Sequence, residues 1–128
     1  MSTVVDASVV IAWQTPDHQF FDQAGRLVGR AEPPLYLNEL NLAEVLVGLA
    51  PQTWPDATAL LTTMGFEFVT TSAVEVARAR LDTRLRMPDA CVLATARKVG
   101  ARAVLTFDAA LAEAARRDGF VTELSDPR

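Results

Sequence analysis

Short apolar segments alternate with longer amphipathic segments along the 128 residues of the chain. Residues 4–5 are apolar and β-branched, and residues 103–106 (AVLT) are mostly apolar, so both stretches predict short strands. Residues 66–69 alternate between apolar and polar side chains, which is typical of a half-buried strand. Two more short strands are predicted at residues 35–37 and 120–122, the second of them at an edge of the sheet.

Helical periodicity appears between these strands, because apolar residues recur there every three or four positions. Asp17 is the expected cap of the helix that follows it. On the inner faces of the later helices we expect Leu60, Met64 and Leu81 among the core residues. The predicted helices begin near residue 7 and then cover about 18–28, 38 or 39 to 50, 53–56 to Gly65, 72–85, 88–100 and 109–117.

The alternation of strands and helices predicts an α/β fold. Strands of three to five residues separated by helices imply parallel βαβ units, with a short central sheet covered by helices on both faces. The sequence contains no internal repeat, no low-complexity tract and no linker. We therefore expect a single domain over residues 1–128, with a frayed tail at residues 125–128.

The composition fits a small domain with its own apolar core, because half of the residues are hydrophobic. No apolar run approaches the roughly 20 residues of a membrane span. The first residues also lack the basic segment that opens a secretion signal. We therefore expect a cytoplasmic protein with no membrane association. Cys91, the only cysteine, has no partner for an internal disulfide, and its apolar neighbours indicate a small buried side chain.

Two acids follow predicted strands: Asp6 comes immediately after the first strand, and Asp108 comes after Phe107, which follows the strand at 103–106. The carboxyl ends of parallel strands form the crevice in which open α/β sheets bind ligands, so both carboxylates are expected at one edge of the sheet. The alternative is that each Asp caps the helix that follows it by accepting backbone N–H groups.

Two further acids lie on predicted helices. Glu44 has Leu40 and Val47 among its helical neighbours, so its carboxylate projects from a largely apolar stripe, where an unpaired charge is costly. Asp89 follows Pro88 in the first turn of its helix. The alternatives are that Glu44 reaches water at the rim of the stripe, and that Asp89 complements the helix dipole, which is worth about 0.3–1 kcal/mol.

Four acids brought to one crevice would repel one another unless a cation neutralised them. Because the set contains no cysteine or histidine, the natural cation is Mg²⁺ or Mn²⁺, and the only histidine, His18, is expected at the surface. Two such ions about 4 Å apart could activate a water and stabilise the leaving oxygen of a phosphodiester. The acids therefore favour metal-dependent hydrolysis.

The formal net charge of −4 argues against bulk electrostatic coating of nucleic acid. Residues 78–102 nevertheless contain seven basic side chains against two acids, a local excess of 7 − 2 = +5. A polyanion could be guided to this segment, and Arg80, Arg84 and Arg86 are the predicted RNA contacts. Arg80 and Arg84 are expected one turn apart on one helix face. The alternative is an ordinary solvated helix face.

The segments VVDASVVIA, LAEVLVGL, MPDACVLATARKVGA and AVLTFDAAL resemble the PIN domain, in particular the VapC-like ribonuclease toxins of bacterial toxin–antitoxin pairs. The resemblance spans the whole chain in order. It implies a Mg²⁺- or Mn²⁺-dependent endoribonuclease that forms a homodimer and is inhibited by a cognate VapB-like antitoxin, whose C-terminal segment occupies the active-site groove. The residues that it assigns as metal-binding acids are Asp6, Glu44, Asp89 and Asp108, with Ser8 and Thr106 as supporting polar groups.

The chain departs from this family pattern just after the fourth acid. Many relatives have another acid or Asn followed by an aromatic residue, where this chain has Ala110 and Leu111, so the ligand set of a second metal is open. A phosphotransfer receiver would need a Lys at Thr106, and a haloacid-dehalogenase-type phosphatase a second Asp at Ser8. No glycine-rich nucleotide loop follows the first strand. The remaining alternative is a PIN-like module that binds RNA or protein with little or no cleavage.

Overall fold

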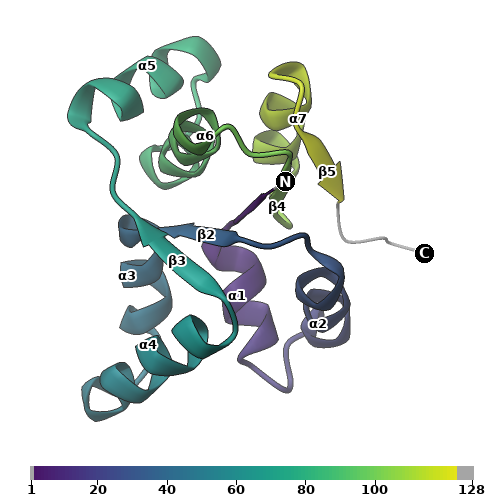
Figure 1. Cartoon of the computed structure of the whole chain (residues 1–128), viewed down its shortest axis with the longest axis vertical. Helices are drawn as coiled ribbons and strands as arrows, with labels where there is room; N and C mark the ends of the chain where they lie inside the picture. Colours follow the sequence, from purple (N-terminus) through teal and green to yellow (C-terminus); the bar gives the residue numbers. More distant parts are fainter. Residues whose placement is uncertain (1, 124–128) are drawn as a thin grey trace.

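A five-stranded parallel sheet forms the centre of the protein, as a computed structural model of the chain shows for residues 2–123 (Figure 1). The predicted frayed tail at 125–128 lies outside these described residues. The strands stand in the order β3-β2-β1-β4-β5, and every neighbouring pair is parallel. The strands are β1 (Thr3–Val5), β2 (Leu35–Asn38), β3 (Phe66–Val69), β4 (Ala103–Leu105) and β5 (Val121–Glu123).

Helices connect the strands, as the sequence predicts. None of those in residues 2–123 is long and apolar enough to cross a membrane. The helices are α1 (Ala7–Trp13), α2 (Phe21–Arg30), α3 (Glu39–Val47), the 3₁₀ turn η1 (Pro51–Thr53), α4 (Trp54–Thr63), α5 (Ala73–Thr83), α6 (Met87–Val99) and α7 (Ala109–Arg117).

Helices cover both faces of the sheet, which confirms the predicted α/β architecture. Along β1 the side chains alternate, so Val4 packs with α5, α6 and α7 on one face, whereas Val5 packs with α1 to α4 on the other. Figure 1 shows α5, α6 and α7 on one side of the strands and the earlier helices on the opposite side. Cys91 lies on α6 and is buried in the core, as expected.

Several local predictions are wrong. Phe20, not Asp17, is the cap residue of α2, and the ring of His18 accepts a hydrogen bond from the Phe20 N–H at 3.0 Å. Leu60, Met64 and Leu81 are exposed rather than in the core. The helix expected to reach residue 50 ends at Val47 and is followed by η1.

Helix α5 also ends earlier than its apolar pattern suggests. It begins with a capping box, in which the Ser72 hydroxyl accepts the Glu75 N–H and the Glu75 carboxylate accepts the Ser72 N–H. It ends at Thr83, because Arg84 takes a left-handed backbone conformation with φ 62°. This conformation costs a residue with a Cβ roughly 1–2 kcal/mol. Arg84 therefore does not share a regular helix face with Arg80, contrary to the prediction.

The strand order reverses direction between β1 and β4, since the chain moves outward from β1 to β2 and β3 and then returns to β4 on the other side. Val5 is in register with Leu105, so these two strands end side by side. In open parallel sheets such a reversal opens a crevice at the carboxyl ends of the strands. The segments after β1 and β4 therefore meet there.

Candidate active site

Asp6 directly follows β1 and lies at the floor of this crevice. Its carboxylate is buried, with the residue 5% exposed. The Oδ2 atom accepts hydrogen bonds from the Ser8 hydroxyl at 2.8 Å and from the Thr106 hydroxyl at 2.7 Å. The side chain does not cap α1, so the capping alternative is wrong for Asp6. Two hydroxyl donors hold this carboxylate instead.

Burial raises the pKa of Asp6, because a charge far from water is poorly solvated. The hydroxyls of Thr106 and Ser8 oppose this effect by stabilising the ionised form, and the nearby charge of Asp108 adds to it. A fixed cation beside Asp6 would relieve both the burial penalty and the repulsion.

Asp108 follows β4 and faces the same crevice. Its Oδ1 atom accepts the Leu111 N–H at 2.9 Å, so the capping interpretation is confirmed for this residue. One carboxylate oxygen is thereby oriented by the first turn of α7. The backbone between β4 and α7 also orients the two supporting hydroxyls. The Thr106 hydroxyl accepts the Asp108 N–H at 3.0 Å, and the Ser8 hydroxyl accepts the Phe107 N–H at 3.2 Å.

Asp89 enters from the first turn of α6 and is 6% exposed. The effects of burial and then of the charges of Asp108 and Asp6 raise its pKa to about 6, while Arg86 acts in the opposite direction. The Arg86 Nε atom lies 3.6 Å from Asp89 Oδ2, and the Arg86 side chain is 77% exposed. A hydrated guanidinium at this distance compensates the buried carboxylate only weakly.

Glu44 reaches the crevice from α3, but it is exposed at the rim and not buried in an apolar stripe. The inward face of α3 contains Asn41, which is completely buried. The Asn41 amide donates hydrogen bonds to Glu44 Oε1 at 2.9 Å and to the Pro88 carbonyl at 3.2 Å. Its Oδ1 atom is buried without a hydrogen-bond partner among the described residues. Asn41 therefore links Glu44 to the start of the helix that carries Asp89.

The four predicted acids line one cavity of about 180 Å³. Ser8 and Arg86 also line it. Within residues 2–123, no three acidic, histidine or cysteine side chains already form a group that could hold a metal ion. The acids thus share a cavity without forming a closed metal site.

The chemistry of this cavity fits a divalent cation. All four charged donors are carboxylates, which Mg²⁺ and Mn²⁺ prefer, and two of them are buried with raised pKa values. The repulsion among Asp6, Asp89 and Asp108 is the imbalance that a cation would remove.

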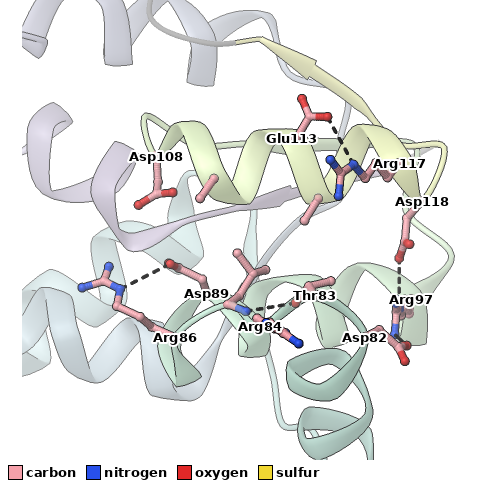
Figure 2. Close-up of a pocket in the computed structure, with 13 residues that line it drawn as sticks. Asp82, Thr83, Arg84, Arg86, Asp89, Arg97, Asp108, Glu113, Arg117 and Asp118 are labelled. Carbon is pink, nitrogen blue, oxygen red and sulfur yellow. Dashed lines mark hydrogen bonds and ion pairs between the residues drawn. The ribbon is translucent and has the colours of Figure 1, made fainter.

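A second, larger cavity of about 480 Å³ adjoins the first and shares Arg86, Asp89 and Asp108 with it. We call it the α5–α7 groove, because it lies between the end of α5, the start of α6 and one face of α7. Figure 2 shows Asp89 and Asp108 at one end of the groove and Arg97 at the other.

The sequence profile of the PIN domain matches residues 3–117. The chain belongs to the PIN domain family. The resemblance stated from the sequence is thereby confirmed over the part of the chain that contains all four acids. No curated protein matches the sequence significantly.

Solved structures share the fold of this PIN domain. Mycobacterium tuberculosis VapC20, described as a sarcin-ricin loop cleaving toxin, has a TM-score of 0.72 and 20% identity, with 93% of this chain and 96% of that chain covered. A toxin–antitoxin complex from Klebsiella pneumoniae has a TM-score of 0.68 and 20% identity, with 83% and 86% covered. VapBC2 from Rickettsia felis, bound to a promoter DNA fragment, has a TM-score of 0.63 and 15% identity, with 98% and 100% covered. At these identities the likeness shows the fold.

Of the three arginines predicted to contact RNA, only two line the α5–α7 groove of this PIN domain. Arg84 and Arg86 line the α5–α7 groove, whereas Arg80 does not. The two positions that depart from the family pattern also differ, since Leu111 is completely buried in the core and Ala110 lines the groove. Sequence reasoning missed Asn41. The signal for it was a polar residue one turn before Glu44 on an apolar helix.

Proposed function

We propose that this PIN domain is a Mg²⁺- or Mn²⁺-dependent endoribonuclease, with Asp6, Glu44, Asp89 and Asp108 as the metal-binding acids. The observation that supports this most strongly is the shared cavity, which four carboxylates from four different segments line. A structural role would not require buried like charges, because each costs free energy unless it is compensated.

The chain's own residues would prepare the site for a cation and a phosphodiester. Ser8 and Thr106 donate to Asp6 Oδ2 and so favour the ionised carboxylate that a cation needs. The first turn of α7 orients Asp108, and Asn41 holds Glu44 at the rim. A bound divalent cation would supply Lewis acidity, lower the pKa of a water and offset the charge of the phosphate.

We further propose that the protein acts as the toxin of a toxin–antitoxin pair. Two of the solved structures with this fold are complexes of such pairs, and a third is described as a sarcin-ricin loop cleaving toxin. The partners that follow are an RNA substrate, a VapB-like antitoxin and a second copy of the chain. The alternative of a binding module without catalysis would leave the converging acids without a role.

The test of catalysis is incubation of the purified protein with total cellular RNA in Mg²⁺, in Mn²⁺ and in EDTA, beside an Asp6→Asn variant. We expect the wild type to make discrete cuts only when metal is present. We expect no cuts from the variant, because the asparagine side chain has nearly the same shape as aspartate but lacks its charge. An Asp22→Asn variant is the control, because Asp22 is exposed on α2 and lies outside the cavity. Cuts that persist in EDTA, or that Asp6→Asn still makes, would refute the proposed function.

The test of the toxin role is induced expression of the intact chain in bacteria without a partner. Growth arrest by the wild type and normal growth with Asp6→Asn are the expected results. Unimpaired growth with the wild type, at matched protein levels and with cleavage activity shown in vitro, would refute the toxin role and leave the nuclease.

A further inference from the structure

We infer that the α5–α7 groove binds the RNA strand next to the bond that is cut, and that Arg84 and Arg86 hold its phosphates there. This inference rests on the proposed nuclease function and adds to it the path of the strand. The groove leads away from the acid cavity, with which it shares Asp89 and Asp108. A strand whose scissile phosphate lies at the acids therefore has this groove as an adjoining space.

The groove has the size and the wall needed for a nucleotide. Its volume of about 480 Å³ falls within the range of ligand pockets, roughly 300–1,000 Å³. The α7 side of the groove presents Ala110 and Ala114, whose small side chains leave this space open. A longer residue at Ala110, which is exposed, would fill it without disturbing the core.

The charges that line the groove are not equally available to a phosphate. Arg97 is occupied by Asp118 at 2.6 Å and by Asp82 at 2.9 Å, as Figure 2 shows at the far end of the groove. Arg117 pairs with Glu113 at 3.3 Å. Arg97 thus connects α6 to α5 and to the end of α7, and Arg117 is paired within α7. A phosphate would have to displace a carboxylate to bind either arginine.

Arg84 and Arg86 remain available. Arg86 lines both the groove and the acid cavity, and Arg84 lines the groove. Arg84 is exposed and forms no ion pair with a carboxylate in residues 2–123. Arg86 has only the 3.6 Å contact to Asp89, and its side chain is 77% exposed. A guanidinium binds phosphate oxygens through parallel N–H groups, so Arg86 beside the acid cavity and Arg84 on the groove wall are suited to bind the phosphates of one strand.

The backbone at Arg84 gives independent support. Its φ of 62° is a conformation that glycine or asparagine adopts at lower cost, yet an arginine stands there with its side chain on the groove. A position chosen for stability alone would favour glycine. The structure therefore predicts that replacing Arg84 with glycine does not lower stability, although it weakens RNA binding.

The test is the affinity of a fluorescent single-stranded RNA of about 12 nucleotides, measured by anisotropy in EDTA over a range of salt concentrations. We expect Arg84→Ala and Arg84→Gly to weaken binding about fivefold and to reduce the slope of log K against log salt by about 0.7. Arg84→Lys should retain the slope, because it retains the charge. Arg80→Ala is the matched control on α5, since Arg80 is exposed outside the groove.

A second pair of variants tests the space in the groove without changing charge. Ala110→Leu should weaken RNA binding by filling the groove, whereas Ala109→Leu, one residue earlier and outside the groove, should not. Urea unfolding of every variant accompanies the binding data, and none is expected to be less stable than the wild type.

The outcomes separate this inference from the nuclease itself. If the wild type cleaves RNA and both groove variants bind RNA as their controls do, the groove is not the path of the strand and the inference is wrong. A loss of affinity in Arg84→Gly that accompanies a loss of stability would also overturn it. If the wild type neither binds nor cleaves RNA with metal present, the proposed function fails and this inference fails with it.

Discussion

Replacing Asp89 with asparagine should make the metal-free protein more stable at neutral pH. The fold raises the pKa of Asp89 from 3.8 to about 6, mainly by burial and then by the charges of Asp108 and Asp6. Ionised Asp89 therefore destabilises the folded state. The rise in pKa corresponds to a loss of about 3 kcal/mol in the free energy of unfolding above pH 6, where the carboxylate is ionised in both the folded and the unfolded chain.

The sign of the pH dependence follows from the same values. Because the folded state binds the proton more tightly, the penalty from Asp89 decreases as the pH falls from about 6 towards 3.8. The variant lacks the charge and so gains most at about pH 7.5. Asparagine also loses the favourable interaction of a carboxylate with the start of α6, which is worth about 0.3–1 kcal/mol. We therefore expect the free energy of unfolding to rise by about 2 kcal/mol at this pH. At about pH 4.5 the gain should fall below about 1 kcal/mol.

The chain offers a closely matched control. Asp56 is preceded by Trp54-Pro55 at the start of α4, just as Asp89 is preceded by Met87-Pro88 at the start of α6. Asp56 is exposed, so Asp56→Asn should lose only the small dipole contribution and become slightly less stable.

The assay is urea unfolding in EDTA, followed by circular dichroism, for the wild type and both variants at the two pH values. A destabilised Asp89→Asn, or a gain that is equal at both pH values, would refute the electrostatic account of this carboxylate. Adding Mn²⁺ should stabilise the wild type by mass action and leave Asp89→Asn unchanged, because the variant lacks a proposed ligand.

The remaining predictions concern residues around the acids. Thr106→Val should lower stability at about pH 7.5 by about 1–3 kcal/mol, since buried Asp6 loses a hydroxyl donor, and should lower it less at about pH 4.5; an equal loss at both pH values in urea unfolding would contradict this. Asn41→Leu removes a buried unpaired oxygen and the donor to Glu44, so urea unfolding should show no loss of stability while a metal titration of cleavage shows a higher requirement. Ser72→Ala should cost about 0.5–2 kcal/mol by breaking the capping box, with the cleavage rate of the folded protein unchanged.

The positions of Asp6 and Asp108 were predictable because they depend on local pattern and on a topological rule. A β-branched run followed by Asp predicts a strand end, and parallel strands place such ends at one edge of the sheet. The structure adds that β1 and β4 are neighbours, which the sequence alone does not specify. The hydroxyls of Ser8 and Thr106 then meet at Asp6, as the family resemblance implied.

Glu44, Arg84 and Leu81 show why the rest was not predictable. Helical periodicity identifies a stripe but not how far neighbouring elements cover it. Leu81 was expected in the core and is exposed, and for Glu44 the alternative of a rim position that reaches water is the one observed. The end of α5 has no glycine or proline to announce it, and the left-handed turn falls on Arg84 instead. In each case tertiary contacts decide an outcome that local pattern leaves open.

A metal titration of RNA cleavage tests whether the four acids of the cavity bind the ion on which cleavage depends. The single-turnover cleavage rate is measured against Mn²⁺ concentration for the wild type, Glu44→Gln and Glu39→Gln. Both substitutions remove one exposed charge from α3, but only Glu44 lines the acid cavity. We expect coincident curves for the wild type and Glu39→Gln, and a Glu44→Gln variant that is inactive or needs a higher Mn²⁺ concentration. A Glu44→Gln curve that coincides with that of the wild type, or cleavage without metal, would show that these acids do not bind a catalytic ion.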